Sequence, residues 1–218
     1  VEDPLNIQTR PGMIKYIDQN GDGVINDQDK VVLGQALPNV MGGFTNTFNY
    51  KNWSLTVFFN YALGGKIINT NVTKLDLYQA GNNNAYADGL GAWRPANPIT
   101  GDQGWMGGSK PLPSSNSSPS TARLYTQNVI DRWIEDGSYL RLKTLSLTYT
   151  VPEKISRKIG MQRLMLSLKG TNLWTWTKYR GFDPEMSSSV GTSNSTLGID
   201  RSSYPASKSF TFNVNITF

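Results

Sequence analysis

Six residues between Asp18 and Asp29 have the types and spacing of a calcium-binding loop. In the stretch DQNGDGVINDQD, oxygen-bearing side chains stand at loop positions 1, 3, 5 and 9, and a carboxylate stands at position 12. Gly23 occupies position 6, where such a loop turns sharply. Asp replaces the usual Glu at position 12, which predicts weaker binding. The expected ligands of a structural Ca²⁺ are Asp18, Asn20, Asp22, Val24 (through its backbone carbonyl), Asn26 and Asp29.

A metal-free turn is the alternative for the same stretch. Runs of Asp, Asn and Gly form turns readily, because Asp and Asn side chains accept hydrogen bonds from the backbone two residues on and Gly adopts positive φ without strain. Either way, we expect a structural role for the loop rather than a catalytic one, since no neighbouring residue could use a bound ion as a Lewis acid.

Other chemistry is sparse in this chain of 218 residues. It has no His and no Cys, which removes the commonest general base and every thiolate zinc site. The net charge of +5 is spread along the chain, so we expect no nucleic-acid partner. Nothing in the sequence constrains the separation of the carboxylates that could form a hydrolytic pair, so we expect no enzyme. These carboxylates are Asp131, Glu135, Asp136, Asp183 and Glu185.

The elements that would position these residues are β-strands. Five segments alternate apolar and polar residues with the period of two that is typical of strands. In the third segment the apolar phase slips near Lys143, which predicts a β-bulge. The five segments are 42–50, 53–61, 138–151, 163–174 and 208–218.

The connections alternate between short and long. Two residues separate the first pair of strands and about ten separate the third from the fourth, whereas 62–137 and 175–207 are long. This alternation is typical of outer-membrane β-barrels, whose periplasmic turns are short and whose external loops are long. The aromatic residues then form two expected girdles. Tyr50, Trp53, Tyr149 and Phe218 belong to the inner one, and Tyr61, Tyr139, Trp174, Trp176 and Phe210 to the outer one.

We therefore predict an all-β fold, in which about five C-terminal strands belong to a large antiparallel transmembrane β-barrel with long extracellular loops. Five strands cannot close a barrel, so we expect the chain to be part of a longer protein. The predicted layout is an extracellular loop 1–40 with the calcium-type loop, a hairpin 41–61, an extracellular loop 62–137, a hairpin 138–173, an extracellular loop 174–207 and a final strand 208–218. The C-terminus would lie in the periplasm.

Several long motifs resemble one family. The stretch from MIKYIDQNGDGVINDQDK to FFNYALGGKIIN is similar to the C-terminal region of SusC/RagA-type TonB-dependent transporters of Bacteroidetes. So are AWRPANP, EDGSYLRLKTLSLTYTVP, GTNLWTWTKYRGFDPE and YPASKSFTFNVNITF, in the same order along the chain.

The resemblance implies a function and partners. The family consists of outer-membrane barrels that import oligosaccharides, or peptides in some members, with energy from TonB. It implies a SusD-like lipoprotein lid, a TonB contact through an N-terminal region outside this chain, contact with outer-membrane lipid, and a dimer of transporter–lid pairs. Trp93 and Trp105 would pack in a loop or against the lid. The alternative function is a secreted, soluble, calcium-stabilised β-sandwich module that binds carbohydrate.

Overall fold

The computed structural model describes residues 16–72, 87, 96, 99, 104, 130–185, 197–201 and 204–218. Trp93 and Trp105, expected to be loop or interface residues, lie outside this set. The chain divides into two compact units, each described here by itself. The first comprises Val1–Gly34 and Ile68–Ile134, and the second comprises Gln35–Ile67 and Glu135–Phe218.

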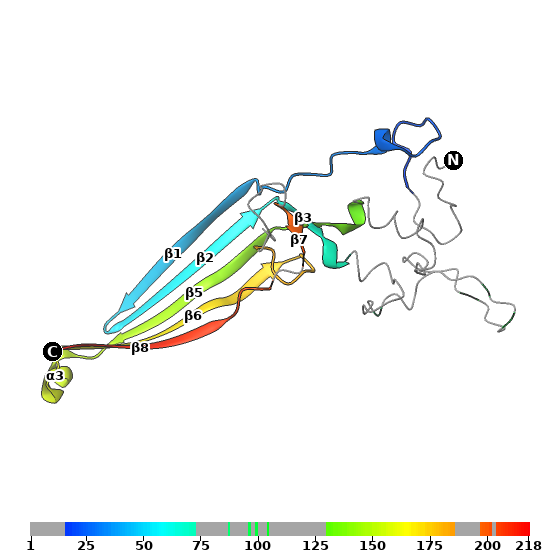
Figure 1. The fold of residues 1–218 in the computed structure, drawn as a ribbon. Coiled ribbons are helices and arrows are strands. Elements are labelled where there is room, and N and C mark those ends of the chain that lie inside the picture. The colour runs from blue at the N-terminus through cyan, green and yellow to red at the C-terminus, as the bar shows by residue number, and fades with distance from the viewer. Residues whose placement is uncertain are drawn as a thin grey trace. The chain divides into compact units, whose positions relative to one another are not determined.

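A five-stranded antiparallel sheet dominates the second unit (Figure 1). Its strand order follows the chain, β1-β2-β5-β6-β8, so each strand pairs with the long strand nearest to it in sequence. This arrangement confirms the predicted all-β, antiparallel fold. The strands are β1 (Val40–Tyr50), β2 (Trp53–Leu63), β5 (Tyr139–Thr150), β6 (Arg163–Thr177) and β8 (Ser209–Thr217).

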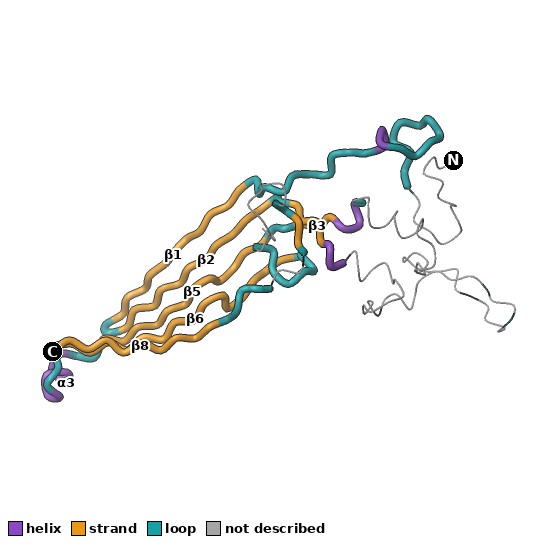
Figure 2. Tube along the Cα trace, viewed as in Figure 1, coloured by secondary structure: helices purple, strands orange, loops and turns teal. Residues whose placement is uncertain are grey.

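Two short turns join neighbouring strands at the same end of the sheet (Figure 2). Tyr50 pairs with Trp53, which leaves Lys51 and Asn52 as a two-residue turn. Lys51 has a φ of 51°, and positive φ is what such tight hairpin turns require. The second turn contains α3 (Glu153–Ser156) and η4 (Arg157–Ile159). It ends at Gly160, whose φ of 78° suits a residue without a side chain.

The predicted bulge is present in β5. Phe58 pairs with Thr144 and Phe59 pairs with Leu142, so Lys143 is the extra residue between them. Opposite it, the pairing of β5 with β6 is also irregular between Leu142 and Thr144. The extra residue returns Leu145 to the face that carries Leu142, which explains the slip of the apolar phase in the sequence.

Short elements complete the described chain. A three-stranded sheet has the order β4-β3-β7, formed by β4 (Ile134–Asp136), β3 (Lys66–Asn69) and β7 (Ile199–Asp200). Two 3₁₀ turns are η1 (Asp27–Asp29) and η3 (Asp131–Trp133). Among the described residues, no helix is both long enough and apolar enough to cross a membrane.

The five-stranded sheet has little apolar core of its own. Ala62 and Tyr139 are buried, whereas the large hydrophobic side chains of β8 are exposed, Phe212 at 65 %. A sheet in water normally covers its apolar face with a second layer. The exposed side chains therefore indicate a sheet whose apolar face meets something other than water.

Candidate functional site

One face of the five-stranded sheet is apolar from strand to strand. The pairing register places alternating residues of neighbouring strands side by side on the same face. Asn46 of β1, opposite Val57, interrupts this face. On β2 and β5 the apolar pairs are Trp53–Tyr149, Leu55–Leu147, Val57–Leu145, Phe59–Leu142 and Tyr61–Leu140; on β6 and β8 they include Leu164–Ile216, Leu166–Val214 and Leu168–Phe212.

The opposite face is lined mainly by small polar side chains. Thr47 and Thr56 lie side by side there, with their hydroxyl oxygens 3.3 Å apart. None of the five strands contains Asp or Glu, so every charged residue in them is a cation. The β6–β8 pairs on this face are Arg163–Thr217, Met165–Asn215, Ser167–Asn213 and Lys169–Thr211.

Aromatic rings gather at both ends of the apolar face. At the end with the short turns, the rings of Trp53 and Tyr149 lie 4.6 Å apart, and Tyr50 pairs with Trp53. Towards the other end, the ring of Phe59 lies 6.4 Å from that of Trp176. Trp174 and Trp176 are neighbours there, with ring centroids 6.2 Å apart. Such rings suit the headgroup level of a bilayer, where one end of the side chain is apolar and the other is hydrated.

Tyr139 does not join these rings, so its predicted place in the outer girdle is wrong. It precedes Leu140, which pairs with Tyr61 on the apolar face, and strand alternation turns Tyr139 to the polar face. There its hydroxyl accepts a hydrogen bond from the Asn60 side chain at 3.3 Å. The guanidinium of Arg141 lies 5.6 Å from its ring centre.

A buried ion network lies on the polar face. Arg141 of β5 donates to a carboxylate oxygen of Glu185 at 2.7 Å and to Asp183. Its Nε donates to the hydroxyl of Thr175 at 2.9 Å. Arg141 and Asp183 are only 3 % and 4 % exposed. Lys143, the bulge residue, also binds Glu185 at 2.7 Å. The network attaches the segment that follows β6 to the polar face of the sheet.

Four of the five carboxylates of the sequence analysis have partners in the second unit, two of them in this network. Asp183 and Glu185 meet at Arg141. Glu135 binds Arg180 at 3.1 Å, and Asp136 accepts a hydrogen bond from the Ser138 hydroxyl at 2.6 Å. Sequence reasoning did not single out Arg141. The available signal was a pair of cations, Arg141 and Lys143, in a strand that contains no Asp or Glu.

In the first unit, side chains of the calcium-type loop accept hydrogen bonds from the loop's own backbone. Asp18 accepts hydrogen bonds from the backbone of Gly21 at 2.7 Å and of Gly23 at 2.8 Å. Asp29 accepts from the backbone of Gln19 at 2.8 Å and of Asn26 at 2.7 Å. The two ends of the loop are therefore joined through Asp29.

The remaining expected ligands form local turns. The side chain of Asn20 accepts a hydrogen bond from the backbone N–H of Asp22 at 3.0 Å. The side chain of Asp22 accepts one from the backbone N–H of Val24 at 2.8 Å. Asn26 caps η1 by accepting from Gln28 at 2.7 Å. Within the described part of the chain, no three His, Cys, Asp or Glu side chains gather closely enough to hold a metal. An ion in this loop would therefore need the amide and carbonyl oxygens of Asn20 and Val24 as well.

The closure of this loop should depend on pH. The backbone N–H groups of Asn26 and then Gln19 hold the pKa of Asp29 below its usual range. A carboxyl whose pKa is lower in the folded state contributes stability above its unfolded pKa, about 4, and loses it as the pH falls through the folded pKa. We expect amide exchange at Gln19 and Asn26 to be slow at neutral pH and to lose its protection only below about pH 4. Loss of protection already at pH 6 would contradict this.

The chain matches no protein-family model, but it is similar to several known proteins. It is 33% identical to TonB-dependent receptor P3 of Formosa agariphila over 98% of this chain and 20% of that protein. It is 24% identical to TonB-dependent receptor SusC of Bacteroides thetaiotaomicron over 93% of this chain and 17% of that protein. It therefore spans about a fifth of the length of these curated relatives.

A solved structure of a related transporter has a similar fold. The RagAB peptide transporter matches 86% of this chain and 18% of its own chain, with a TM-score of 0.62 and 26% identity. The same complex in its 'open-open' state matches with a TM-score of 0.61. The two-faced antiparallel sheet, the alternation of short turns with long connections, and these similarities all indicate the same family. The chain belongs to the SusC/RagA family of TonB-dependent receptors, of which it represents the C-terminal part.

Proposed function

We propose that this chain forms part of the wall of an outer-membrane, TonB-dependent nutrient importer. The observation that carries the proposal is the division of the sheet into an apolar and a polar face that both continue across all five strands. Such a wall places its apolar face against lipid and its polar face towards the barrel interior. Similarity to the RagAB peptide transporter supports the same function.

The proposed orientation follows from the turns. The Lys51–Asn52 turn and the α3–η4 turn lie at one end of the sheet and would face the periplasm. Residues 1–40, 62–137 and 174–207 would be extracellular, the last strand 208–218 would end in the periplasm, and the two aromatic groups would lie at the two surfaces of the membrane.

The proposed partners belong to the whole protein. TonB would act through an N-terminal region outside this chain, and a SusD-like lipoprotein would cover the external mouth. The substrate would be an oligosaccharide or a peptide; the printed description of RagAB as a peptide importer supports the second, for that protein. Two transporter–lid pairs would form a dimer.

Purification of the full-length protein from native membranes tests this function. We expect the protein in the outer-membrane fraction, soluble only in detergent, and accompanied by a lipoprotein. Cells that lack it should lose uptake of one class of oligosaccharide or peptide. A protein that stays in solution without detergent would overturn the proposal and favour a secreted carbohydrate-binding β-module.

We also propose that the calcium-type loop binds a structural Ca²⁺ through Asp18, Asn20, Asp22, Val24, Asn26 and Asp29. Backbone hydrogen bonds already hold the side chains of Asp18 and Asp29, at the two ends of the loop, against the loop's own backbone. Calcium prefers such a set of carboxylate, amide and carbonyl oxygens. The bound ion would stiffen this extracellular segment.

Replacing Asp22 by Asn should weaken calcium binding by the full-length protein on the order of tenfold or more, because affinity in such loops follows the number of charged ligands. Isothermal titration with CaCl₂ measures this. Asp27→Asn is the matched control: it removes the same charge from the same loop at a position that is not a ligand and pairs with Lys30 at 2.6 Å. Equal effects of the two variants, or no calcium binding by the unmodified protein, would contradict the proposed site.

A further inference from the structure

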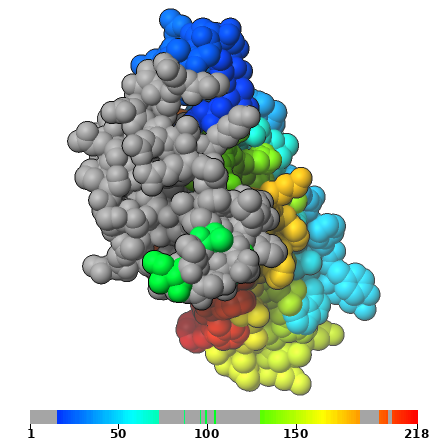
Figure 3. Space-filling model, turned by 90° about the vertical axis from the view of Figure 1, so that its right-hand side faces the viewer, coloured from blue at the N-terminus to red at the C-terminus, as the bar shows by residue number. Residues whose placement is uncertain are grey.

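The turn between β5 and β6 exposes hydrophobic side chains at the end of the sheet. Ile155 and Ile159, four residues apart in α3 and η4, are 54 % and 56 % exposed. In the space-filling view this turn projects at the end of the sheet, in yellow-green (Figure 3). Two such exposed isoleucines on one short turn form a small apolar surface that suits an apolar partner.

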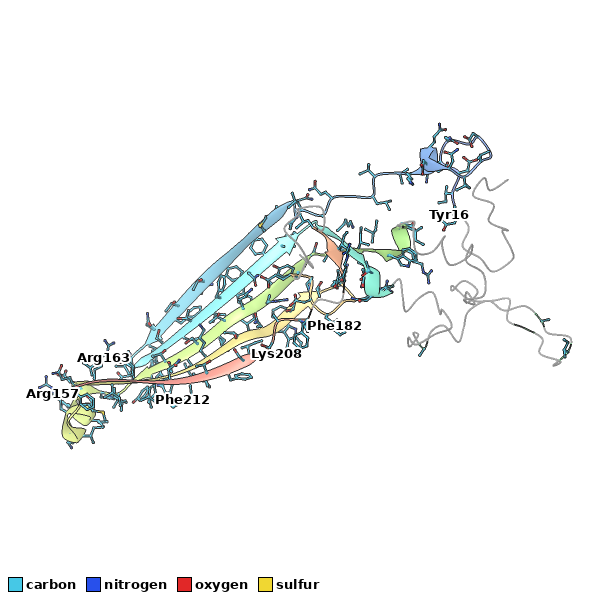
Figure 4. The ribbon with its side chains drawn as sticks, in the orientation of Figure 1. Tyr16, Arg157, Arg163, Phe182, Lys208 and Phe212 are labelled. Atoms are coloured by element: carbon cyan, nitrogen blue, oxygen red, sulfur yellow. The ribbon has the colours of Figure 1, made fainter. Side chains whose placement is uncertain are left out.

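The same turn carries cations without a charge partner. Arg157 pairs with Glu153, whereas Lys154 and Lys158 make no ion pair or hydrogen bond among the described residues. Figure 4 labels Arg157 and Arg163 at this end of the sheet. Glu153 is the only carboxylate side chain in the two turns and the residues that border them. The cations there are Lys51, Lys154, Arg157, Lys158 and Arg163.

Internal hydrogen bonds hold the turn in this conformation. Ser156 is fully buried, and its hydroxyl oxygen lies 3.1 Å from the carbonyl of Glu153 and 3.3 Å from that of Gln162. The backbone N–H of Met161 donates to the carbonyl of Ser156 at 3.0 Å. The turn is thus fixed to the start of β6, whereas its two isoleucines and two lysines are exposed.

Along the chain, the turn follows directly on residues of the apolar face of the sheet. Tyr149, two residues before Val151, and Leu164, the second residue of β6, both belong to that face. The next exposed hydrophobic side chains beyond them are Ile155 and Ile159. A bilayer whose acyl chains cover the apolar face along the strands would therefore have its headgroup region at the level of this end of the sheet.

We propose that the α3–η4 turn is an anchor for a phospholipid surface with anionic headgroups. Ile155 and Ile159 enter the boundary between headgroups and acyl chains, and Lys154 and Lys158 extend their stems over the same boundary to reach the lipid phosphates. The inference rests on the proposed function, because it takes the apolar face of the sheet to face lipid. Its added content is a specific lipid contact at the periplasmic turn.

The two lysines determine how strongly the turn should prefer anionic lipid. Each cation near an anionic lipid surface contributes on the order of a fivefold preference for that lipid. Replacing both by Gln should therefore lower the enrichment of anionic over neutral phospholipid around the protein by about 25-fold if the contributions multiply.

Reconstituted full-length transporter provides the test. A nitroxide at position 159 (Ile159→Cys) is placed in bilayer discs of phosphatidylcholine, with or without phosphatidylglycerol; this chain contributes no other cysteine. Accessibility to oxygen and to a water-soluble nickel complex reports the depth of the label. We expect an interfacial depth with phosphatidylglycerol and a shallower label in Lys154→Gln/Lys158→Gln. The same protein, washed in detergent, should retain less phosphatidylglycerol when both lysines are replaced.

Two controls separate the possible failures. Lys208→Gln removes a charge at the opposite end of the sheet, where Lys208 lies over Trp174 at 5.6 Å, and should leave both measurements unchanged. A nitroxide at position 214 reports the apolar face itself. If position 214 is in lipid but position 159 is in water, the anchor is wrong and the importer stands. If position 214 is in water, the proposed function fails as well. A label at 159 that neither reagent reaches would indicate a protein partner and overturn the lipid anchor.

Discussion

Replacing Arg141 by Met should destabilise the protein by about 3–5 kcal/mol, the usual cost of breaking a buried ion pair by removing one partner. Arg141 is 3 % exposed and Asp183 is 4 % exposed, so the substitution leaves a carboxylate in a site that water hardly reaches. Glu185 retains its ion pair with Lys143, at 2.7 Å, so the substitution affects it less. Two backbone amides still donate to Asp183, from Glu185 at 2.9 Å and from Ala206 at 3.2 Å, which limits the loss.

Urea unfolding of the detergent-solubilised full-length protein measures this effect. Arg157→Met is the matched control, because Arg157 pairs with Glu153 at the surface, where the two side chains are 73 % and 65 % exposed. An exposed pair contributes about 0–1 kcal/mol. If the two variants lose the same stability, Arg141 does not hold a buried pair in the folded protein.

The network also has a local consequence. Arg141 holds residues 183 and 185 against the sheet, and Asp183 in turn accepts a hydrogen bond from the backbone of Ala206. Arg141→Met should therefore release this segment before the whole protein unfolds. Limited proteolysis after β6 should become faster in Arg141→Met and stay unchanged in Arg157→Met.

Replacing Val214 by Arg should cost about 2–4 kcal/mol if Val214 lies near the middle of the membrane. Val214 pairs with Leu166 and has Phe212 and Ile216 on the same face of β8. An arginine there would place a charge in the hydrocarbon layer, where water cannot solvate it. The free energy of unfolding of the full-length protein from lipid vesicles gives the number.

Asn213→Arg is the control for this prediction. Asn213 is the next residue of the same strand and pairs with Ser167 on the polar face. Strand alternation points its side chain away from lipid, so the same arginine should cost close to nothing there. Equal costs at positions 213 and 214 would mean that the two faces of the sheet do not differ in what they contact.

The sequence alone was sufficient to predict the five long strands and the bulge, but not the short strands β3, β4 and β7. Strand pattern is local: successive side chains point to opposite faces, so alternation of Phe210, Phe212 and Val214 with polar residues already defines a two-faced strand. The slip at Lys143 is equally local, because one extra residue reverses the phase of those that follow. β6, however, runs on to Thr177, past the predicted end at Trp174. The motif resemblance, and not the alternation, predicted the family.

Tertiary structure decided which distant residues meet. Arg141 and Asp183 are 42 residues apart, and the path of the chain after β6 brings them together. Alternation alone signals that an inward cation needs a partner but does not say which carboxylate supplies it. The face of Tyr139, by contrast, was already set locally by alternation with Leu140 and Leu142. Local periodicity determines what each strand exposes on its two faces, whereas contacts across strands and loops depend on register and chain path, which only the folded chain defines.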